Sequence, residues 1–360
     1  MHGKTGQQAQ TRGARIAGVV SALPPKVVEN DTFVERFGDA VAEVTKMTGV
    51  KSRHVAENGV ATSDLCFAAG QRLLEGLGWE PESVDGIIFI SQSPDYPLPA
   101  TACLLQQRLG MRTTTVAFDV NLGCSAYPYG LWLAMSLIQT GSMNRVLIAV
   151  GDINTRANDP MDRSVAMLFG DCGAMTALEA GDANGDVAHF LLGTDGRGGD
   201  NLIVPASRHR DRTGDARFAG RNLDMVYMDG AEIFNFTLKA VPPLVRETIE
   251  FAGVPQEEYA SFLFHQANTF MLNHLAKKAK LPKDKVPINM DRYGNTSSAT
   301  IPLVMTTDVA DLLKSGKQRI GMFGFGVGYS WGSASMDVGP LKVCETVIAP
   351  AAPIAQADAA

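Results

Sequence analysis

The stretch TVAFDVNLGCSAYPYGLWLAMSLI, residues 115–138, contains an apolar segment, a short polar loop and a longer apolar segment in direct succession. We predict a strand over 115–120, a chain-reversing loop over 121–126 and a helix over 129–138. Cys124 then lies where the loop enters the helix. A thiol there faces unpaired backbone N–H groups and the positive end of the helix dipole, and both favour the thiolate. Most free cysteines are small buried apolar residues, so Cys124 needs partners before it is interpreted as a nucleophile.

Two candidate partners occur downstream at similar places in the chain. Residues 259–268, YASFLFHQAN, indicate a short buried strand that ends in a polar turn, with His265 at the C-terminal end of the strand. Residues 288–302, INMDRYGNTSSATIP, indicate a second polar loop that opens a helix, and Asn295 lies in that loop. A lone histidine is more often structural, and an asparagine after glycine usually serves turn geometry. The combination with Cys124 favours a catalytic interpretation.

Composition argues against several other classes of protein. The chain has 360 residues, 45% of them hydrophobic, which suits two domains or two closely packed halves. A formal net charge of −6 without a long basic run argues against a nucleic-acid binder. Five widely spaced cysteines with no C-x-x-C pair argue against a disulfide framework or a cysteine-rich zinc site. Because residues 1–15 lack the apolar core of a signal peptide and no window is long and apolar enough to span a bilayer, we expect a cytoplasmic protein that does not enter the membrane.

Strand-like apolar runs alternate with helix-like segments along the chain, which predicts α/β architecture. Two pairs of segments echo each other between the halves and suggest a duplicated domain, joined in the Gly/Asp-rich stretch 181–186. The expected organisation has four parts. These are a flexible N-terminus over 1–13, a first half over 14–180 with the nucleophile, a second half over 181–340 with His265 and Asn295, and a flexible Ala/Pro-rich tail over 341–360.

Several ordered motifs resemble those of the β-ketoacyl-acyl carrier protein synthase III family, in the thiolase superfamily, from about Ala14 to Val338. Besides the loop around Cys124, the segments that carry this resemblance are MTGV (47–50), DPMDR (159–163), FGD (169–171), HQAN (265–268), GNTS (294–297) and GVGYSWG (326–332). The resemblance implies an α/β, thiolase-like five-layered αβαβα fold of two similar halves. It also implies a homodimer with a Cys-His-Asn site between the halves of each chain.

The resemblance implies a mechanism as well. Cys124 would take an acyl group from a thioester, with the backbone N–H groups of Cys124 and Gly326 as the oxyanion hole. A malonyl-type extender thioester would then lose CO₂, and His265 and Asn295 would donate hydrogen bonds to the enolate that attacks the acyl group. The substrates would arrive on coenzyme A or on acyl carrier protein, in fatty-acid or polyketide-like metabolism. No metal or organic cofactor is implied.

Four binding residues are carried over from the family by position. Asn268 corresponds to a residue that hydrogen-bonds the pantetheine arm, and Arg156 to one that lies against the coenzyme A nucleotide. Leu98 corresponds to a residue, commonly Phe, that projects from the partner subunit to close the acyl pocket. Phe325 corresponds to an aromatic residue packed beside the catalytic site.

The expected substrate entrance shows one similarity to the family and three departures. Lys277 and Lys278 lie where the family presents basic residues to an acidic carrier protein, although two lysines on a helix are also typical of a solvated face. Glu43 replaces a tryptophan that stacks on adenine, Met47 replaces an arginine beside the coenzyme A phosphates, and Phe270 replaces an arginine that contacts the carrier. These departures predict weak binding of free coenzyme A and delivery of at least one substrate on a carrier protein.

Three functions fit these residues. The first is a decarboxylating condensing enzyme, and the second is an acyltransferase that moves an acyl group from Cys124 to an oxygen or nitrogen nucleophile. The third is a catalytically silent subunit that supports a paired partner. Asn295 favours condensation, because transfer to a heteroatom needs no enolate donor. The presence of Cys124, His265 and Asn295 together argues against a silent subunit.

Overall fold

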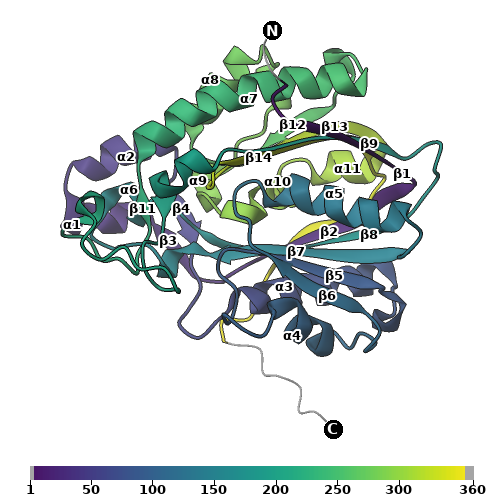
Figure 1. The fold of residues 1–360 in the computed structure, drawn as a ribbon, viewed down its shortest axis with the longest axis horizontal. Coiled ribbons are helices and arrows are strands. Elements are labelled where there is room, and N and C mark those ends of the chain that lie inside the picture. Colours follow the sequence, from purple (N-terminus) through teal and green to yellow (C-terminus); the bar gives the residue numbers. More distant parts are fainter. Residues whose placement is uncertain (1–3, 353–360) are drawn as a thin grey trace.

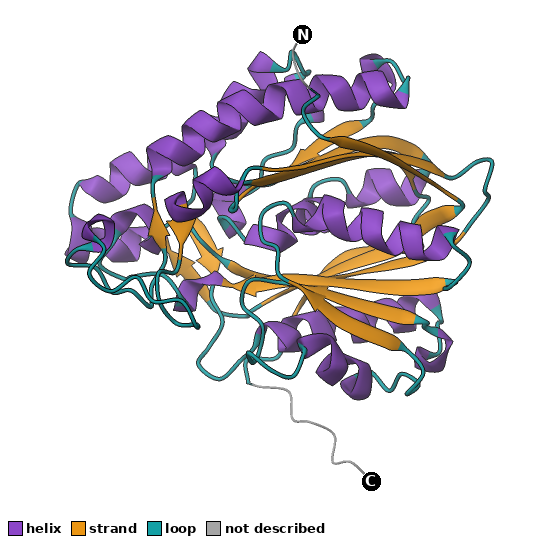
Figure 2. Cartoon of the chain, viewed as in Figure 1, coloured by secondary structure: helices purple, strands orange, loops and turns teal. Residues whose placement is uncertain are grey.

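The computed structural model describes residues 4–352 and consists of two β-sheets between three layers of helices (Figure 1). Helices α7 (Gly230–Ala252) and α8 (Thr269–Lys278) lie over the outer side of one sheet. Helices α3 (Thr62–Leu77) and α4 (Thr101–Arg108) cover the outer side of the other (Figure 2). The layer between the sheets contains α5 (Ala126–Gln139), α10 (Thr300–Thr307) and α11 (Ala310–Ser315). The predicted five-layered thiolase-like α/β fold is confirmed.

The sheet of the first half has six strands, and it contains the strand that leads to Cys124. Its central strands β5 and β7 pair in parallel, β7 pairs antiparallel with β8, and nearly all of their residues are buried. This burial explains why these segments read as continuous apolar runs in the sequence. In order across the sheet, the strands are β15 (Val343–Ile348), β2 (Ala14–Leu23), β8 (Asp171–Ala180), β7 (Arg145–Ile153), β5 (Gly86–Ile90) and β6 (Val116–Val120).

The sheet of the second half has five strands, and two of them lead to the other candidate residues. Strand β12 pairs in parallel with β13, while β13 and β14 form an antiparallel pair. His265 follows β12 directly, and the glycine-rich segment 324–332 lies where β13 turns into β14. In order across the sheet, the strands are β1 (Gln7–Arg12), β9 (Val187–Thr194), β14 (Ser330–Val338), β13 (Gln318–Gly326) and β12 (Ser261–Phe264).

Both ends of the chain differ from the expectation of flexible termini. Residues 7–12 form β1, which pairs antiparallel with β9, and the indole Nε1 of Trp331 donates to the carbonyl of Thr5 at 2.9 Å. Residues 343–348 form β15, which pairs in parallel with β2. Both strands lie at the edges of their sheets and are held by backbone hydrogen bonds, which amino-acid composition does not reveal. For this reason the sequence did not predict a strand at residues 7–12 or at residues 343–348. The expected tail beyond residue 352 lies outside the described residues.

Helix α5 is packed between the two sheets, which explains its almost uniformly apolar sequence. Residues Leu131, Ala134, Met135 and Ile138 are buried there, in a cluster that includes side chains from both sheets. A helix enclosed on both sides has no face that must be polar. The N-terminus of α5 is therefore fixed in the centre of the molecule, and the loop before it brings Cys124 to the boundary between the halves.

Short elements gather at the end of the molecule where the catalytic loops lie, on the left in Figure 2. They are α1 (Val34–Phe37), α2 (Ala40–Thr48), α6 (Arg163–Ala166), α9 (Met290–Tyr293), β3 (Val27–Glu29), β4 (Ser52–His54), β10 (Leu202–Ile203) and β11 (Tyr227–Met228). Among the described residues, no helix combines the length and the apolar character needed to cross a membrane. All five cysteines lie in the described part of the chain, and none is in a disulfide there.

Candidate active site

Cys124 lies in the loop between β6 and α5, two residues before the helix begins, and only 9% of its surface is exposed. Burial raises the pKa of its thiol to about 11, while the backbone N–H of Val327 acts in the opposite direction. The carboxylate of Asp152 adds to the rise, and the hydroxyl of Ser297 opposes it. At pH 7 a group with this pKa is ionised in about one molecule in 10⁴. The resting nucleophile is therefore a thiol, and it must lose its proton when the substrate arrives.

Gly326 is the point of closest approach between the two halves at the nucleophile. A Cβ on Gly326 would lie 2.5 Å from Cβ and 2.8 Å from Sγ of Cys124, so only glycine leaves room for the thiol. We expected the N–H of Gly326 to be the second donor of the oxyanion hole. The amide that hydrogen-bonds the thiol belongs to Val327, one residue later, together with that of Cys124 itself. Gly326 provides space beside the thiol, and its part in the oxyanion hole stays a prediction.

His265 is buried at the C-terminal end of β12, and its ring is held by hydrogen bonds on one edge. Its Nδ1 lies 2.8 Å from Oγ1 of Thr300, and that hydroxyl donates to the carbonyl of Ser297 at 2.9 Å. Because the carbonyl only accepts, the single hydroxyl proton of Thr300 is committed to it, and Nδ1–H of His265 must be the donor to Thr300. Burial lowers the pKa of His265 to about 3, against the opposing effect of the Ser297 carbonyl. The resting imidazole is thus neutral, with a free lone pair on Nε2.

Asn295 is held in place by its backbone and has one free side-chain donor. Its N–H donates to the carbonyl of Leu168 at 2.9 Å, and its carbonyl accepts from the N–H of Gly170 at 3.1 Å. The side-chain oxygen of Asn295 accepts from the N–H of Ser297 at 2.9 Å. This contact fixes the orientation of the amide and leaves Nδ2 as a donor toward other groups. Since Leu168 and Gly170 belong to the first half, Asn295 is positioned by contacts across the two halves.

Ser297 and Asp152 are site residues that the sequence did not single out. Ser297 has a positive φ of 52°, a conformation that costs energy in a residue other than glycine. Its hydroxyl interacts with both Cys124 and Asp152. Asp152 is fully buried and accepts from the N–H (3.1 Å) and the hydroxyl (2.6 Å) of Ser298. Asp152 is the next-to-last residue of the apolar strand β7, so a search of the C-terminal ends of strands would have found it.

A cavity of about 360 Å³ opens beside the nucleophile, and Cys124, Ser297 and Val327 are among its lining residues. Its apolar walls include Phe169, Ile203 and Val226. Its polar lining was not predicted, and it consists of Gln92, Ser93, Asn121, Asn154, Asn158, Ser207, Arg208, Arg210 and Arg212. The cavity thus combines an apolar wall with amide and guanidinium groups.

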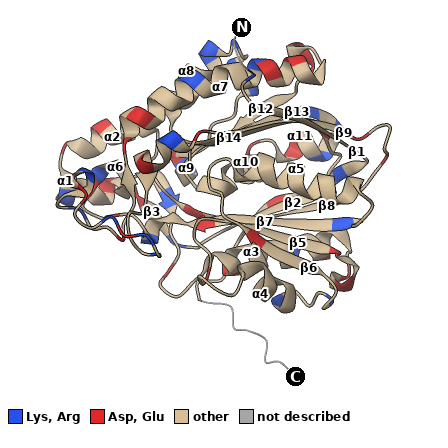
Figure 3. Ribbon diagram, in the orientation of Figure 1, with Lys and Arg blue, Asp and Glu red and all other residues tan. Residues whose placement is uncertain are grey.

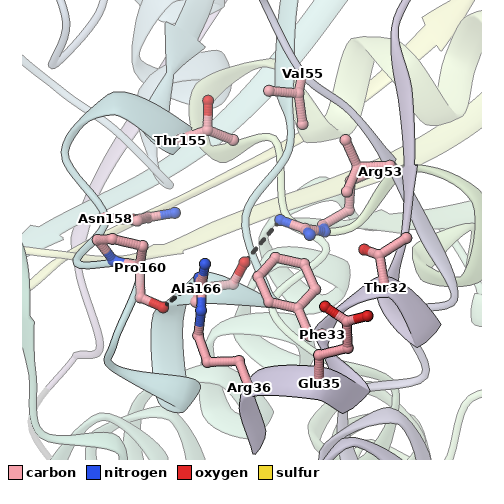
Figure 4. Close-up of a pocket in the computed structure, with 11 residues that line it drawn as sticks. Thr32, Phe33, Glu35, Arg36, Arg53, Val55, Thr155, Asn158, Pro160 and Ala166 are labelled. Carbon is pink, nitrogen blue, oxygen red and sulfur yellow. Dashed lines mark hydrogen bonds between the residues drawn. The ribbon is translucent and has the colours of Figure 1, made fainter.

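A second cavity of about 630 Å³ shares Asn158 with the first (Figure 4). The buried guanidinium of Arg53 lies in it and donates to the carbonyls of Ala166 (2.8 Å) and Phe169 (3.1 Å). The ring of Phe33 lies 5.3 Å from this guanidinium. Burial lowers the pKa of Arg53 to about 10, so the group remains charged at neutral pH. Arg53 fixes the segment that carries Phe169 and thereby supports the wall of the first cavity.

The other predicted binding residues lie apart from this cavity. Arg156 lines an adjoining hollow, which shares Ser93, Ile153 and Ala157 with the first cavity, and it donates to the carbonyl of Glu57 at 2.7 Å. Asn268 caps α8, with its side-chain oxygen accepting from the N–H of Met271 at 2.7 Å. Phe325 is buried, and its ring meets that of His265 edge to face at 5.6 Å. Leu98 is 81% exposed in the single chain and does not reach Cys124 within it.

The expected substrate entrance is exposed and partly apolar. Lys277 and Lys278 are exposed near the end of α8. Phe270, at the start of the same helix, is 57% exposed, and its ring stacks on that of Phe234 at 5.9 Å. Met47 is exposed at the end of α2. Apolar side chains therefore occupy surface positions where the resembled family has cations.

Comparisons with known proteins agree with this geometry. Residues 118–196 match the family described as 3-oxoacyl-[acyl-carrier-protein (ACP)] synthase III, and residues 249–338 match its C-terminal part. The beta-ketoacyl-[acyl-carrier-protein] synthase III of Methylococcus capsulatus is 35% identical over 324 residues, which cover 90% of this chain and 98% of the relative. The enzyme of the same name from Caldanaerobacter subterraneus is 34% identical over 89% of this chain and 96% of the relative.

Solved structures show the same relationship. A 3-oxoacyl-(acyl-carrier protein) synthase from Burkholderia xenovorans LB400 superimposes with a TM-score of 0.93 and 54% identity, over 96% of this chain and 99% of that one. A priming β-ketosynthase of the R1128 polyketide pathway superimposes with a TM-score of 0.80 and 26% identity, over 91% of this chain and 96% of that one. The chain belongs to the 3-oxoacyl-[acyl-carrier-protein] synthase III family of condensing enzymes.

Proposed function

We propose that this protein catalyses the decarboxylative condensation of an acyl group on Cys124 with a malonyl-type thioester. One observation carries the assignment of roles. Ser297 interacts with all three candidate residues: its hydroxyl with Cys124, its N–H with Asn295, and its carbonyl with His265. A single residue with a strained backbone thus fixes the nucleophile, the base and the enolate donor relative to one another.

The first step transfers the acyl group to Cys124. Its sulfur attacks the thioester carbonyl carbon, the new C–S bond forms, and the C–S bond to the donor thiol breaks. The proton of Cys124 passes to Nε2 of His265, whose lone pair is free because Nδ1 carries the ring proton. By resemblance to the family, the N–H groups of Cys124 and Gly326 stabilise the negative oxygen of the tetrahedral intermediate. The departing thiolate takes the proton from Nε2 of His265, which returns to its neutral form.

The second step forms the carbon–carbon bond. The extender loses its carboxylate as CO₂, and the electron pair left behind becomes an enolate. Asn295 donates to the enolate oxygen from Nδ2, and neutral His265 donates from Nε2 in the tautomer that carries its ring proton there. The enolate carbon attacks the acyl carbonyl, the sulfur of Cys124 is expelled as a thiolate, and it takes a proton from solvent.

The two half-reactions can be measured separately in variants of the site. Asn295→Ala should accept an acyl group at close to the normal rate but decarboxylate the extender about 10²–10³-fold more slowly, as for loss of one oxyanion donor. His265→Ala should slow both half-reactions, because it removes both the acceptor of the thiol proton and an enolate donor. Intact-mass spectrometry follows acylation, CO₂ release follows decarboxylation, and Asn273→Ala, on the exposed face of α8, is the matched control.

Two outcomes would contradict the proposal. If wild-type protein moves the acyl group to an alcohol or amine but forms no β-ketoacyl product, transfer to a heteroatom is the function. If Cys124 is not acylated by any thioester in a panel of chain lengths and carriers, the protein is a silent partner subunit.

We also propose that two chains share the acyl pocket. Leu98 is largely exposed in one chain. An apolar side chain of this size gains by burial, and the resembled family buries its counterpart in the neighbouring subunit. Light scattering at assay concentration should show a dimer. A monomer with full activity would refute the shared pocket.

Carrier-protein delivery is the third part of the proposal. Glu43 and Met47 offer neither an aromatic face nor a cation to coenzyme A, whereas Lys277 and Lys278 offer exposed positive charge beside Phe270. Reversing both lysines to Glu should raise KM for carrier-bound substrate and leave the rate with pantetheine thioesters unchanged. The control reverses Lys314 and Lys317, two exposed lysines elsewhere. Equal efficiency of acetyl-coenzyme A and every carrier-bound acyl group would refute carrier delivery.

A further inference from the structure

We infer that the acyl group accepted by Cys124 ends in a carboxylate, so that the donor is the monothioester of a dicarboxylic acid. The inference rests on the proposed function and concerns the cavity of about 360 Å³ beside the nucleophile. A cavity of this size lies at the small end of the range for ligand sites. An alkyl group would fit best in a cavity lined only by apolar side chains, and this one is not.

Amide groups line the cavity close to the nucleophile. The side-chain oxygen of Gln92 lies against Gly123, the residue before Cys124. Asn154 also lines the cavity, and its Nδ2 is buried without a hydrogen-bond acceptor anywhere in residues 4–352. The side-chain oxygen of Asn158 is likewise buried, and no described group donates to it. Both unpaired atoms are shielded from the open space of the cavity, so these amides make its wall polar without themselves contacting a ligand.

Three arginines of the loop between β10 and β11 complete the lining. Arg212 is occupied, since it pairs with Asp200 at 2.8 Å and with Asp215 at 2.6 Å, and these carboxylates raise its pKa. Arg208 and Arg210 have no carboxylate partner among the described residues. In Figures 1 and 3 this loop lies at the same end of the molecule as α1, and it carries both basic and acidic residues. The ion pairs of Arg212 anchor the loop and leave its two neighbours available.

The charge of the lining is uniformly positive. No aspartate or glutamate in the described part of the chain lines this cavity, while three arginines do. Phe169, Ile203 and Val226 supply an apolar surface in the same cavity, which suits methylene groups. A chain of methylenes with a terminal carboxylate matches both features, because guanidinium groups bind carboxylates by charge-assisted hydrogen bonds. A terminal methyl would make no such hydrogen bond to Arg208 or Arg210, which are exposed.

A phosphate on the carrier arm is the other anion that these arginines could bind. Neither Asn268 nor Arg156, the residues expected beside the arm and the nucleotide, lines this cavity, whereas Cys124 does. This placement favours the acyl group over the arm. Thioesters of pantetheine separate the two sources, because pantetheine carries no phosphate.

The test compares adipoyl-, hexanoyl- and monomethyl-adipoyl-pantetheine as acyl donors. The first two have six-carbon chains that differ only in a terminal carboxylate or methyl, and the third masks the charge. The second-order rate constant for acylation of Cys124 is followed by intact-mass spectrometry. Since a hydrogen bond to a charged group contributes more than a neutral one, we expect adipoyl to react about ten- to a hundredfold faster than either neutral donor.

Variants of the lining give the second arm of the test. The double substitution Arg208→Gln and Arg210→Gln should abolish the preference for adipoyl and leave the hexanoyl rate unchanged. Asn154→Leu should raise the hexanoyl rate and lower the adipoyl rate. Arg246→Gln, an exposed arginine on α7 outside this cavity, is the control and should keep the wild-type preference.

The outcomes separate this inference from the proposed function. Hexanoyl reacting as fast as adipoyl, or a preference that survives the double substitution, would overturn the inference while condensation stands. A loss of rate in the double variant that is confined to phosphorylated donors would assign the arginines to the arm and also overturn it. Failure of every thioester to acylate Cys124 would overturn both.

Discussion

Gly326→Ala is the sharpest test of how the two halves form the nucleophile's environment. The added Cβ would lie 2.5 Å from Cβ and 2.8 Å from Sγ of Cys124, whereas ordinary contacts begin at 3.4 Å. To remove this clash, the new Cβ must move away from Cβ of Cys124 by 0.9 Å (3.4 − 2.5) and from Sγ of Cys124 by 0.6 Å (3.4 − 2.8). The backbone on both sides is buried, so the strain falls on Cys124 and on the amide of Val327 that contacts its thiol.

A displacement of this size has a large kinetic effect and a modest effect on stability. Misplacement of a reacting group by about 1 Å can cost about 10²-fold in rate. Overpacking of one methyl group costs typically about 1–3 kcal/mol in the free energy of unfolding. We therefore expect Gly326→Ala to fold but to acylate Cys124 about a hundredfold more slowly. Intact-mass kinetics with a pantetheine thioester measures the rate, and thermal unfolding measures the stability.

Gly321→Ala is the matched control, because it lies on the same strand β13 and also meets its neighbours closely. Its Cβ would lie 3.0 Å from the ring of Phe323 and 3.1 Å from that of Phe262, with Cys124 absent from its nearest contacts. It should lose stability while retaining the rate of acylation. The reasoning fails if Gly326→Ala acylates normally, or if Gly321→Ala loses the same fraction of the rate.

Three further predictions concern proton transfer, Ser297 and the C-terminal strand. The rate of alkylation of Cys124 by iodoacetamide should rise about tenfold per pH unit from pH 7 to 10, because the pKa of the thiol is raised to about 11. The rate of acylation should stay constant from pH 5 to 9, because the pKa of His265 is lowered to about 3 and its imidazole is unprotonated throughout. If the two rates change with pH in the same way, His265 is not the base. Ser297→Ala should slow alkylation at pH 8 by up to about tenfold, since the hydroxyl that lowers the pKa of Cys124 is lost, and an unchanged alkylation rate would exclude this contact. Val343→Asp should lower the free energy of unfolding by about 2–5 kcal/mol in denaturant titrations, because it buries a charge in β15, and Glu345→Ala on the same strand should change it by less than about 1 kcal/mol.

The three candidate catalytic residues could be located from the sequence because each lies where a local pattern changes. The apolar run 115–120 ends in the loop of Cys124, and the run before His265 ends in a polar turn, so both mark the end of a strand. The end of a strand and the start of a helix can be predicted from the pattern of apolar and polar residues within a window of about ten residues. Asn295 was found in the same way, from a glycine-containing turn before a helix.

Features that depend on contacts between distant segments were not predictable from local patterns. The hydrogen bond from the amide of Val327 to the thiol was not predicted, because the direction of an amide depends on how β13 turns into β14 around Cys124. Strands β1 and β15 were missed because their partners, β9 and β2, lie more than a hundred residues away in the sequence. Arg208 and Arg210 lie in a polar loop of ordinary composition, and only the fold places them beside the nucleophile.

Burial keeps both Cys124 and His265 uncharged before the substrate binds, so backbone N–H groups must stabilise the charge that forms during the reaction. The same exclusion of water that raises the pKa of Cys124 lowers that of His265, so the thiolate–imidazolium pair is unfavourable before the substrate binds. Charge therefore develops only as the thioester is attacked, and we expect fixed backbone N–H donors to compensate it. A side chain on Gly326 would occupy the space beside the sulfur of Cys124. A thiol of low intrinsic reactivity thus becomes a selective nucleophile, since it reacts fast only with a carbonyl that the two halves hold between them.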